Sequence, residues 1–291
     1  MIAFVNAKIN IGLQVVRRRD DGYHDLETIF YPAGLLAGTP VNPVSFCDIL
    51  EIVPSKNHSQ QFQLHLSGNR VDCPLEKNLV YKAAKLYFDR FPVDEDTVDI
   101  NLEKYLPDGA GMGGGSADAA FTLRLLNELF DKCTDEELSR MALELGADCP
   151  FFIYNRPAYA TGRGEILQPI NLDLSGKWLV VVKPTVSIST KEAFAGVTPK
   201  IPDFDLRNIV NISIDEWKER VVNDFETSFF KKYPLLKNIK EDLYIAGALY
   251  ASLTGSGSCF YGIYDNRLLA EEALNIFRPN PTIDRTYLLF L

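Results

Sequence analysis

The sequence predicts a two-domain protein of the α+β class. Three observations lead there: the 291-residue length, a strand–glycine turn–helix order in the first half, and a helix–turn–strand order in the second. The character of the chain also changes after Tyr154. We therefore expect domains at residues 1–154 and 155–291, with a binding cleft between the two halves.

Composition narrows the class of function. A formal net charge of -9 argues against a nucleic-acid-binding surface, which normally has a basic field. Five scattered cysteines without a C-x-x-C pair indicate reduced thiols and a cytoplasmic protein. No export signal is evident at the first residues, and no apolar run approaches the ~20 residues of a membrane span. We expect neither nucleic acid nor a membrane as a partner.

The first half begins with strand-like residues 3–16, which are interrupted by the polar Lys8 and Asn10. Asp21-Gly22 is a hairpin signal. Short strands are predicted at 47–53 and 61–67, and a helix is predicted from Leu79 onward. Apolar and polar residues alternate over 98–103, so a half-buried strand leads into the next segment.

That segment, residues 107–120, holds five glycines within seven positions and continues into a pattern with helical spacing. Glycine lets a backbone approach a ligand closely and turn several N–H groups inward. A loop of this kind before a helix N-terminus favours phosphate, through both the amides and the macrodipole. Ser116 is expected at the head of the helix, where it could also act as an ordinary N-cap.

The rest of the chain alternates helices and strands. Thr134 and Glu137 form a capping-box pattern for a helix that ends near Gly146. The predicted elements that follow are a turn at 159–165, a strand at 178–182, a loop at 198–211, helices at 215–233 and 235–243, a small-residue turn at 253–260, a strand at 261–264, a helix at 268–277 and a strand at 286–290.

Several chemistries are disfavoured. The Walker phosphate loop is absent. Gly109-x-Gly111-x-x-Gly114 satisfies the dinucleotide fingerprint formally, but the strand before it alternates instead of being apolar throughout. The protein-kinase segments H-R-D and D-F-G are missing, and only three histidines with no G-x-S-x-G or H-E-x-x-H give little support to a hydrolase.

The arrangement resembles the GHMP kinase superfamily. Three blocks carry this resemblance: Ala7-Lys8-Ile9-Asn10, the loop at 107–120, and Thr254-Gly255-Ser256-Gly257-Ser258. The resemblance implies a two-domain fold, with an N-terminal domain like ribosomal protein S5 domain 2, a C-terminal ferredoxin-like sandwich and the active site in the cleft. The blocks at 7–13, 18–28 and 146–152 make the chain look most like the members that phosphorylate a cytidine-diphosphate derivative of methylerythritol.

Roles follow from the resemblance residue by residue. ATP is the phosphoryl donor, and its phosphates would be held by Pro107, Gly109, Ala110, Gly111, Met112, Gly113, Gly114, Gly115 and Ser116. Asp148 is the implied catalytic base, with Lys8 beside it. Tyr23 and Phe194 would sandwich the cytosine while His24 bonds its edge, and Asn10 would contact the methylerythritol end. Mg²⁺ is expected, but the sequence names no ligand for it.

The chain departs from the family pattern at several of these positions. Met112 replaces a leucine and Cys149 a valine, both mild apolar changes. Ala117 replaces a serine after Ser116, and Lys191 stands where proline is expected near Phe194. A monomer or weak homodimer is expected. Two alternatives stay open: another alcohol kinase of the superfamily, and a sensor on the same scaffold that binds nucleotide without turnover.

Overall fold

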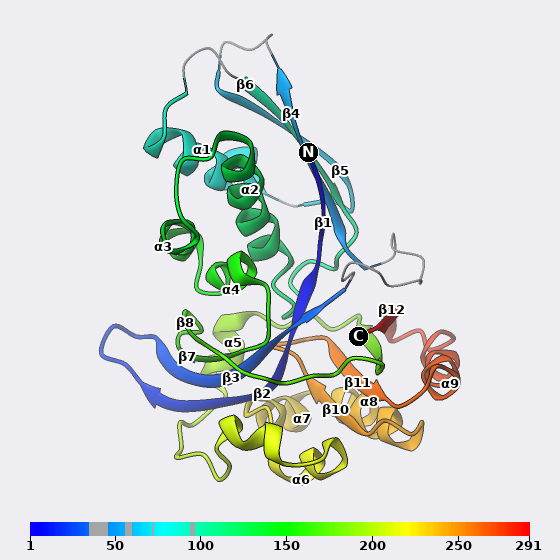
Figure 1. Ribbon diagram of the computed structural model, residues 1–291. Helices are drawn as coiled ribbons and strands as arrows, with labels where there is room; N and C mark the ends of the chain where they lie inside the picture. The colour runs from blue at the N-terminus through cyan, green and yellow to red at the C-terminus, as the bar shows by residue number, and fades with distance from the viewer. Residues whose placement is uncertain (35–45, 56–59, 72, 94–96) are drawn as a thin grey trace. The chain divides into compact units, whose positions relative to one another are not determined.

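The structure, a computed structural model, describes residues 1–34, 46–55, 60–71, 73–93 and 97–291. Its contacts divide the chain into two compact units (Figure 1). Unit 1 comprises residues 1–7, 34–108 and 113–156, and unit 2 comprises residues 8–33, 109–112 and 157–291. The chain changes unit near residue 156, close to the expected domain boundary. Residues 8–33 and 109–112, which the linear division counts in the first half, group with unit 2.

Unit 1 is built on a four-stranded sheet of order β1-β4-β6-β5. The strands are β1 (Ile2–Val5), β4 (Asp48–Ser55), β5 (Phe62–Gly68) and β6 (Thr97–Lys104). In β6, buried residues alternate with half-buried ones from end to end, as the sequence predicted. Strand β6 pairs antiparallel with β4 and parallel with β5. This mixed sheet differs from the doubly wound parallel sheet that a dinucleotide fingerprint requires.

Helices lie on one side of this sheet (Figure 1). They are the short η2 (Leu75–Lys77), α1 (Leu79–Arg90), α2 (Gly114–Phe130), α3 (Asp135–Leu145) and α4 (Cys149–Tyr154). The capping box predicted at the start of α3 is confirmed, because Thr134 and Glu137 each bond the backbone of the other. Small buried residues such as Ala119 and Ala120 in α2, and Ala83 and Ala84 in α1, allow these two helices to pack closely.

Unit 2 contains two sheets. One has the order β2-β3-β7-β8 and consists of β2 (Ala7–Arg18), β3 (His24–Ala33), β7 (Ala158–Gly162) and β8 (Ile166–Pro169). The other has the order β10-β11-β9-β12 and consists of β9 (Trp178–Pro184), β10 (Tyr250–Leu253), β11 (Phe260–Tyr264) and β12 (Ile283–Phe290). The pairing of β3 with β7 explains why residues 8–33 group with unit 2.

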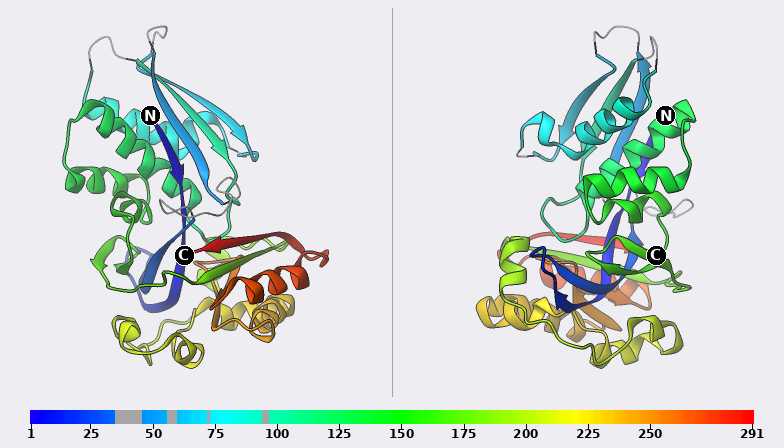
Figure 2. Two further views of the ribbon diagram at one scale, coloured as in Figure 1. Left: turned by 45° about the vertical axis from the view of Figure 1, so that its right-hand side comes forward. Right: turned by 90° about the vertical axis from the view of Figure 1, so that its left-hand side faces the viewer.

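The second sheet carries helices on one face, with α8 and α9 lying along it (Figure 2). The helices of unit 2 are α5 (Thr190–Ala195), η3 (Leu206–Asn211), η4 (Ile214–Glu216), α6 (Trp217–Arg220), α7 (Phe225–Lys232), α8 (Pro234–Ile245) and α9 (Arg267–Phe277). The strands are antiparallel and a helical connection follows β9 and another follows β11, which is the ferredoxin-like β-α-β-β-α-β order. The expected fold of the C-terminal half is confirmed.

One predicted helix is wrong in extent. The apolar spacing over 215–233 suggested a continuous helix, but the chain leaves helical geometry after Arg220 and resumes it at Phe225. In between, the chain pairs with β2: Leu13 N donates to Val222 O at 2.9 Å and Asp224 N donates to Leu13 O at 2.8 Å. Pairing with a distant strand overrides the local helical preference. The loop predicted at 198–211 also ends in the short helix η3.

Among the described residues, we find no helix with the length and apolar character needed to cross a membrane.

Candidate functional site

The glycine loop leads from β6 into α2. Gly109, Gly111 and Gly113 have φ values of 60°, 75° and 71°, a region that L-residues rarely adopt. Gly113 is the N-cap of α2, and no side chain makes a capping hydrogen bond to this end of the helix. Ser116 therefore lies inside the first turn instead of heading the helix, which corrects the expected N-cap. Because no side chain caps α2, its first amides are suited to bind an external acceptor such as phosphate.

The first half of the loop is held within unit 2. Lys8 N donates to Met112 O at 3.0 Å, and Cys259 N lies 3.4 Å from Ala110 O. The hydroxyl of Thr254 donates to Gly111 O at 3.2 Å. Strand β2 and the turn after β10 thus fix the backbone of residues 110–112 by three contacts.

Lys8 and Asn10 lie together on β2, both almost fully buried. The Lys8 ammonium donates to Asn10 Oδ1 and lies 4.7 Å from the centre of the Phe30 ring. Asn10 Nδ2 donates in turn to the hydroxyl of Thr28 at 3.0 Å. Burial of a cation costs free energy unless polar partners surround it, so this sheltered ammonium is suited to attract an anionic group.

The second half of the loop belongs to unit 1, together with Asp148. Asp148 is half-buried at the N-cap position of α4, and its side chain does not cap that helix. The next residue, Cys149, is fully buried, and its thiol shares a hydrogen bond with the hydroxyl of Ser116. Burial raises the pKa of the Cys149 thiol to about 12, so it stays protonated. The thiol ties the start of α4, and with it Asp148, to the first turn of α2.

A buried charge cluster lies beneath this half of the loop. The Lys104 ammonium at the end of β6 bonds Asp48 Oδ2 and, at 2.6 Å, Asp118 Oδ2 on α2. Asp48 Oδ1 also accepts the backbone N–H groups of Tyr105 and Leu106 at 2.6 and 2.8 Å. The carboxylates raise the pKa of Lys104 although burial opposes its charge. The cluster joins three elements at the point where the loop enters α2.

The nucleobase residues proposed from the sequence lie in unit 2. His24, at the start of β3, stacks on Phe194 of α5 with ring centres 4.8 Å apart and planes 19° apart. Phe194 also meets Phe225 edge to face at 5.0 Å. The ring of Tyr23 is 57% exposed, with the Arg163 guanidinium 5.1 Å from its centre. The ring stacked on Phe194 is thus His24, while Tyr23 presents a face to solvent.

His24 is suited to read a polar edge. Burial first, and then the Arg18 guanidinium, lower the pKa of His24 below its usual value. The imidazole is therefore neutral near pH 7, with one nitrogen that donates and one that accepts.

Three residues with a clear structural place escaped the sequence reasoning. Lys104 reads as the polar end of an alternating strand, and Asp118 reads as one polar residue in an alanine-rich turn. Arg163 stood inside a predicted turn without a role. The signal that could have marked Lys104 and Asp118 is that both charges fall on faces that are otherwise apolar, where an unpaired charge is costly.

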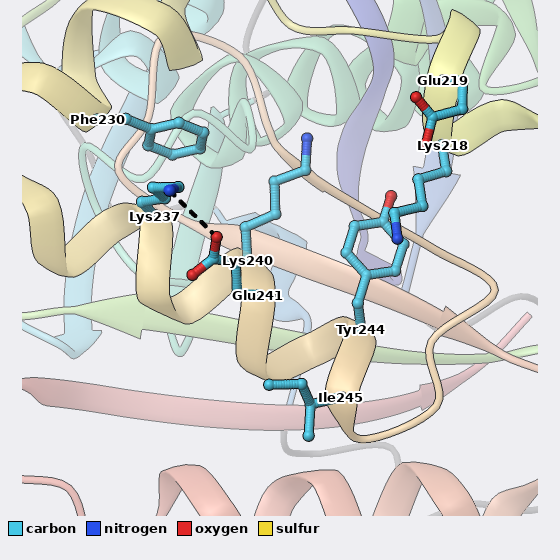
Figure 3. Close-up of a pocket in the computed structure, with 8 residues that line it drawn as sticks. All are labelled: Lys218, Glu219, Phe230, Lys237, Lys240, Glu241, Tyr244 and Ile245. Atoms are coloured by element: carbon cyan, nitrogen blue, oxygen red, sulfur yellow. Dashed lines mark ion pairs between the residues drawn. The ribbon is translucent and has the colours of Figure 1, made fainter.

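A hollow of about 520 Å³ lies elsewhere in unit 2, between α6, α7 and α8 (Figure 3). Its cationic side chains are already engaged: Lys240 bonds the buried Glu226 at 2.6 Å, Lys237 pairs with Glu241, and Lys218 lies over the Tyr244 ring. None of the residues expected to bind substrate or nucleotide lines it. We do not assign it a role.

The space beside the glycine loop and the distribution of metal-ligating side chains bear on nucleotide and metal binding. A Cβ built on Gly109 would meet nothing within 4 Å, so open space adjoins the loop for a phosphate chain. Within the described residues, no group of three or more His, Cys, Asp or Glu side chains gathers as a metal site. A magnesium ion that accompanies nucleotide is usually held by phosphate oxygens, water and one or two protein groups, so a cluster of three such side chains is not required for it.

Comparison with known proteins matches both halves of this chain. Residues 78–156 match the family described as GHMP kinases N terminal domain, and residues 206–280 match GHMP kinases C terminal. The 4-diphosphocytidyl-2-C-methyl-D-erythritol kinase of Bacteroides fragilis is 47% identical over 91% of this chain and 92% of its own. The kinase of the same name from Porphyromonas gingivalis is 41% identical over 94% and 95%.

Solved structures show the same relationship. A crystal structure of 4-(cytidine 5'-diphospho)-2C-methyl-D-erythritol kinase has a TM-score of 0.81 and 32% identity, covering 99% of this chain and 98% of its own. Homoserine kinase from Cytophaga hutchinsonii has a TM-score of 0.70 at 17% identity and covers 99% of this chain and 95% of its own. At that identity the similarity shows a common fold and nothing more. With relatives this similar over nearly its whole length, the chain belongs to the 4-diphosphocytidyl-2-C-methyl-D-erythritol kinase family of the GHMP kinases.

Proposed function

We propose that this protein transfers the γ-phosphoryl group of ATP to the 2-hydroxyl of 4-diphosphocytidyl-2-C-methyl-D-erythritol, a step in non-mevalonate isoprenoid precursor biosynthesis. The observation that carries the proposal is the similarity to kinases of that name over more than nine-tenths of both chains. Residues 107–116 bind the ATP phosphates in this proposal, through the amides at the start of α2 and the open backbone of the loop.

Lys8 and Asp148 carry the chemistry. The sheltered Lys8 ammonium neutralises charge on the transferred group, and Asp148 accepts the proton of the acceptor hydroxyl. A loose phosphoryl-transfer transition state needs little early deprotonation, so Asp148 acts largely by orienting the hydroxyl. Mg²⁺, when bound with the nucleotide, supplies charge neutralisation on the phosphates. Ser116 would supply the hydroxyl that contacts the phosphates or the metal, because the next residue, Ala117, is fully buried and has no hydroxyl.

The substrate end is recognised by aromatic and polar groups of unit 2. The exposed Tyr23 ring offers one stacking face for cytosine, and Phe194, which stacks on His24, supplies the second aromatic ring in this proposal. Stacking tolerates every base, so the neutral His24 imidazole supplies the preference for the cytosine edge. Asn10 contacts the methylerythritol end. We expect a cytoplasmic enzyme that acts as a monomer or weak homodimer.

The test is ATP consumption with three acceptors: 4-diphosphocytidyl-2-C-methyl-D-erythritol, homoserine and mevalonate. We expect turnover with the first alone. The Asp148→Asn variant should lower kcat by roughly 10²-fold or more, the usual scale for loss of a general base. Asp89→Asn, an exposed carboxylate on α1 paired with Lys85, is the matched control and should keep full activity.

Two results would overturn the proposal. Turnover of homoserine or mevalonate in place of the cytidylyl substrate would indicate another alcohol kinase of the superfamily. Nucleotide binding without turnover of any acceptor would indicate a sensor. A folded Asp148→Asn enzyme with near-normal kcat would remove Asp148 from the mechanism without affecting the substrate assignment.

A further inference from the structure

The turn after β10 contacts strand β2 and the glycine loop at the same time. Thr254 is fully buried, and its hydroxyl accepts a hydrogen bond from Asn10 N at 3.1 Å and donates one to Gly111 O at 3.2 Å. A hydroxyl has a single proton. Because the Asn10 N–H can only donate, the Thr254 proton is left for the Gly111 carbonyl. The two bonds therefore fix each other's direction.

The backbones at this contact are as close as glycine allows. A Cβ on Gly111 would lie 2.2 Å from Thr254 O, and a Cβ on Gly255 would lie 2.7 Å from Gly111 O. Such distances leave no room for a side chain at either position. The loop is therefore seated directly on the turn, and the Thr254 hydroxyl adds a side-chain bond to the backbone bonds donated by Lys8 N and Cys259 N.

The turn itself is held from its other side. The buried Asn223 donates from Nδ2 to Leu253 O and to Gly255 O, each at 3.0 Å, and so brackets Thr254. Gly257 N closes the turn on Thr254 O at 3.1 Å. Because the turn is fixed, the hydroxyl transmits the position of a rigid element to the loop.

We propose that Thr254 is a positioning residue for phosphoryl transfer, which holds the glycine loop in register with the strand that carries Lys8 and Asn10. The proposal rests on the function proposed above. Lys8 is bonded to the side chain of Asn10, and the backbone of Asn10 is bonded through Thr254 to the loop. If the hydroxyl is lost, residues 110–112 of the loop can shift relative to the Lys8 ammonium. A misplacement of about 1 Å can cost on the order of 10²-fold in rate.

The test compares two substitutions at this position. Thr254→Val keeps the branched shape but removes both hydrogen bonds, and Thr254→Ser keeps the hydroxyl. We expect Thr254→Val to lower kcat by about 10- to 100-fold. The KM for the cytidylyl substrate should stay unchanged within about threefold, because Tyr23 and His24 bind the cytosine and the bond lost at Asn10 involves its backbone N–H, not its side chain. Thr254→Ser should restore kcat to within about threefold of the wild type.

A matched control separates positioning from stability. Ser252 lies two residues earlier on β10, is also fully buried, and bonds Glu226 Oε1 at 3.2 Å without touching the loop. Ser252→Ala should lower the melting temperature but leave kcat unchanged. If folded Thr254→Val keeps the kcat of Thr254→Ser, or if Ser252→Ala loses kcat equally, the positioning role is overturned.

A second measurement does not depend on turnover. Amide hydrogen exchange should accelerate about tenfold or more in Thr254→Val at Asn10, whose N–H donates to the Thr254 hydroxyl, and at Lys8, whose N–H donates to Met112 O of the loop. Exchange at both amides should stay near wild type in Ser252→Ala. If the wild type fails to phosphorylate the cytidylyl substrate, the proposed function fails while this exchange result still decides the role of Thr254. If Thr254→Val does not fold, Thr254→Ala against Thr254→Ser gives the same comparison, and equal exchange in the two would overturn the proposal.

Discussion

Asp118 should make the stability of the protein depend on pH, and Asp118→Asn should remove that dependence. Burial raises the pKa of this carboxyl from 3.8 to about 8; the Asp48 carboxylate adds to the rise and the Lys104 ammonium opposes it. Among the described residues, Asp118 Oδ1 accepts no hydrogen bond. Two buried carboxyls and one ammonium are best balanced when one carboxyl is protonated.

The sign follows from where the proton is held. Because the folded state binds the proton more tightly than the unfolded state, this group stabilises the fold below pH 4, and the stabilisation is lost as the pH rises towards 8. One linked proton changes the free energy of unfolding by about 1.4 kcal/mol per pH unit. Between pH 5.5 and 7.5 the upper bound is therefore about 3 kcal/mol.

The assay is urea unfolding of the wild type and Asp118→Asn at several pH values. Unfolding should be followed by circular dichroism instead of tryptophan fluorescence. Both tryptophans, Trp178 and Trp217, lie in unit 2, whereas Asp118 lies in unit 1. The stability difference between the two proteins should move by about 2–3 kcal/mol in favour of the variant as the pH rises over this interval. The exposed control Asp89→Asn should run parallel to the wild type. Parallel curves for Asp118→Asn as well would show that Asp118 is ionised throughout, and the reasoning would be refuted.

Three further predictions concern the loop, its charge cluster and the nucleobase. Tyr23→Ala should raise the KM for the cytidylyl substrate by about tenfold or more, since stacking is worth ~1–3 kcal/mol per base, while Tyr23→Phe keeps it; an unchanged KM in Tyr23→Ala would exclude the stacking role. Gly111→Ala should abolish nucleotide binding, measured by calorimetry, because its Cβ would lie 2.2 Å from a carbonyl oxygen; Gly22→Ala, with φ of 86° and open space, is the control for backbone strain alone, and equal binding by the two variants would contradict the clash. Lys104→Met should cost about 3–5 kcal/mol in urea unfolding by leaving two buried carboxyls without a cation, and adding Asp118→Asn should recover part of that loss; a fully additive double variant would show that the three groups are not coupled.

Local chemistry explains what could be predicted. The capping box joins two residues three positions apart, Thr134 and Glu137, so the sequence shows both partners at once. The alternation along β6 and the run of glycines are patterns within one short segment, so the sequence shows them directly as well. The predicted helix at 215–233 failed for the opposite reason. Its interruption is imposed by Leu13, about two hundred residues away, whose backbone pairs with Val222 and Asp224.

The sequence by itself determined the α+β class, the phosphate-type loop and, through its motif blocks, the family. Those signals reside in the order of glycines, strands and helices along the chain. Only the tertiary structure decided that Thr254 joins Asn10 to Gly111, that Lys104 binds two carboxyls, and that Ser116 meets Cys149. Each of these contacts joins side chains or backbone atoms from segments that are far apart in the sequence. A hydrogen bond needs its donor and acceptor within about 3 Å, and folding alone brings these atoms to that distance.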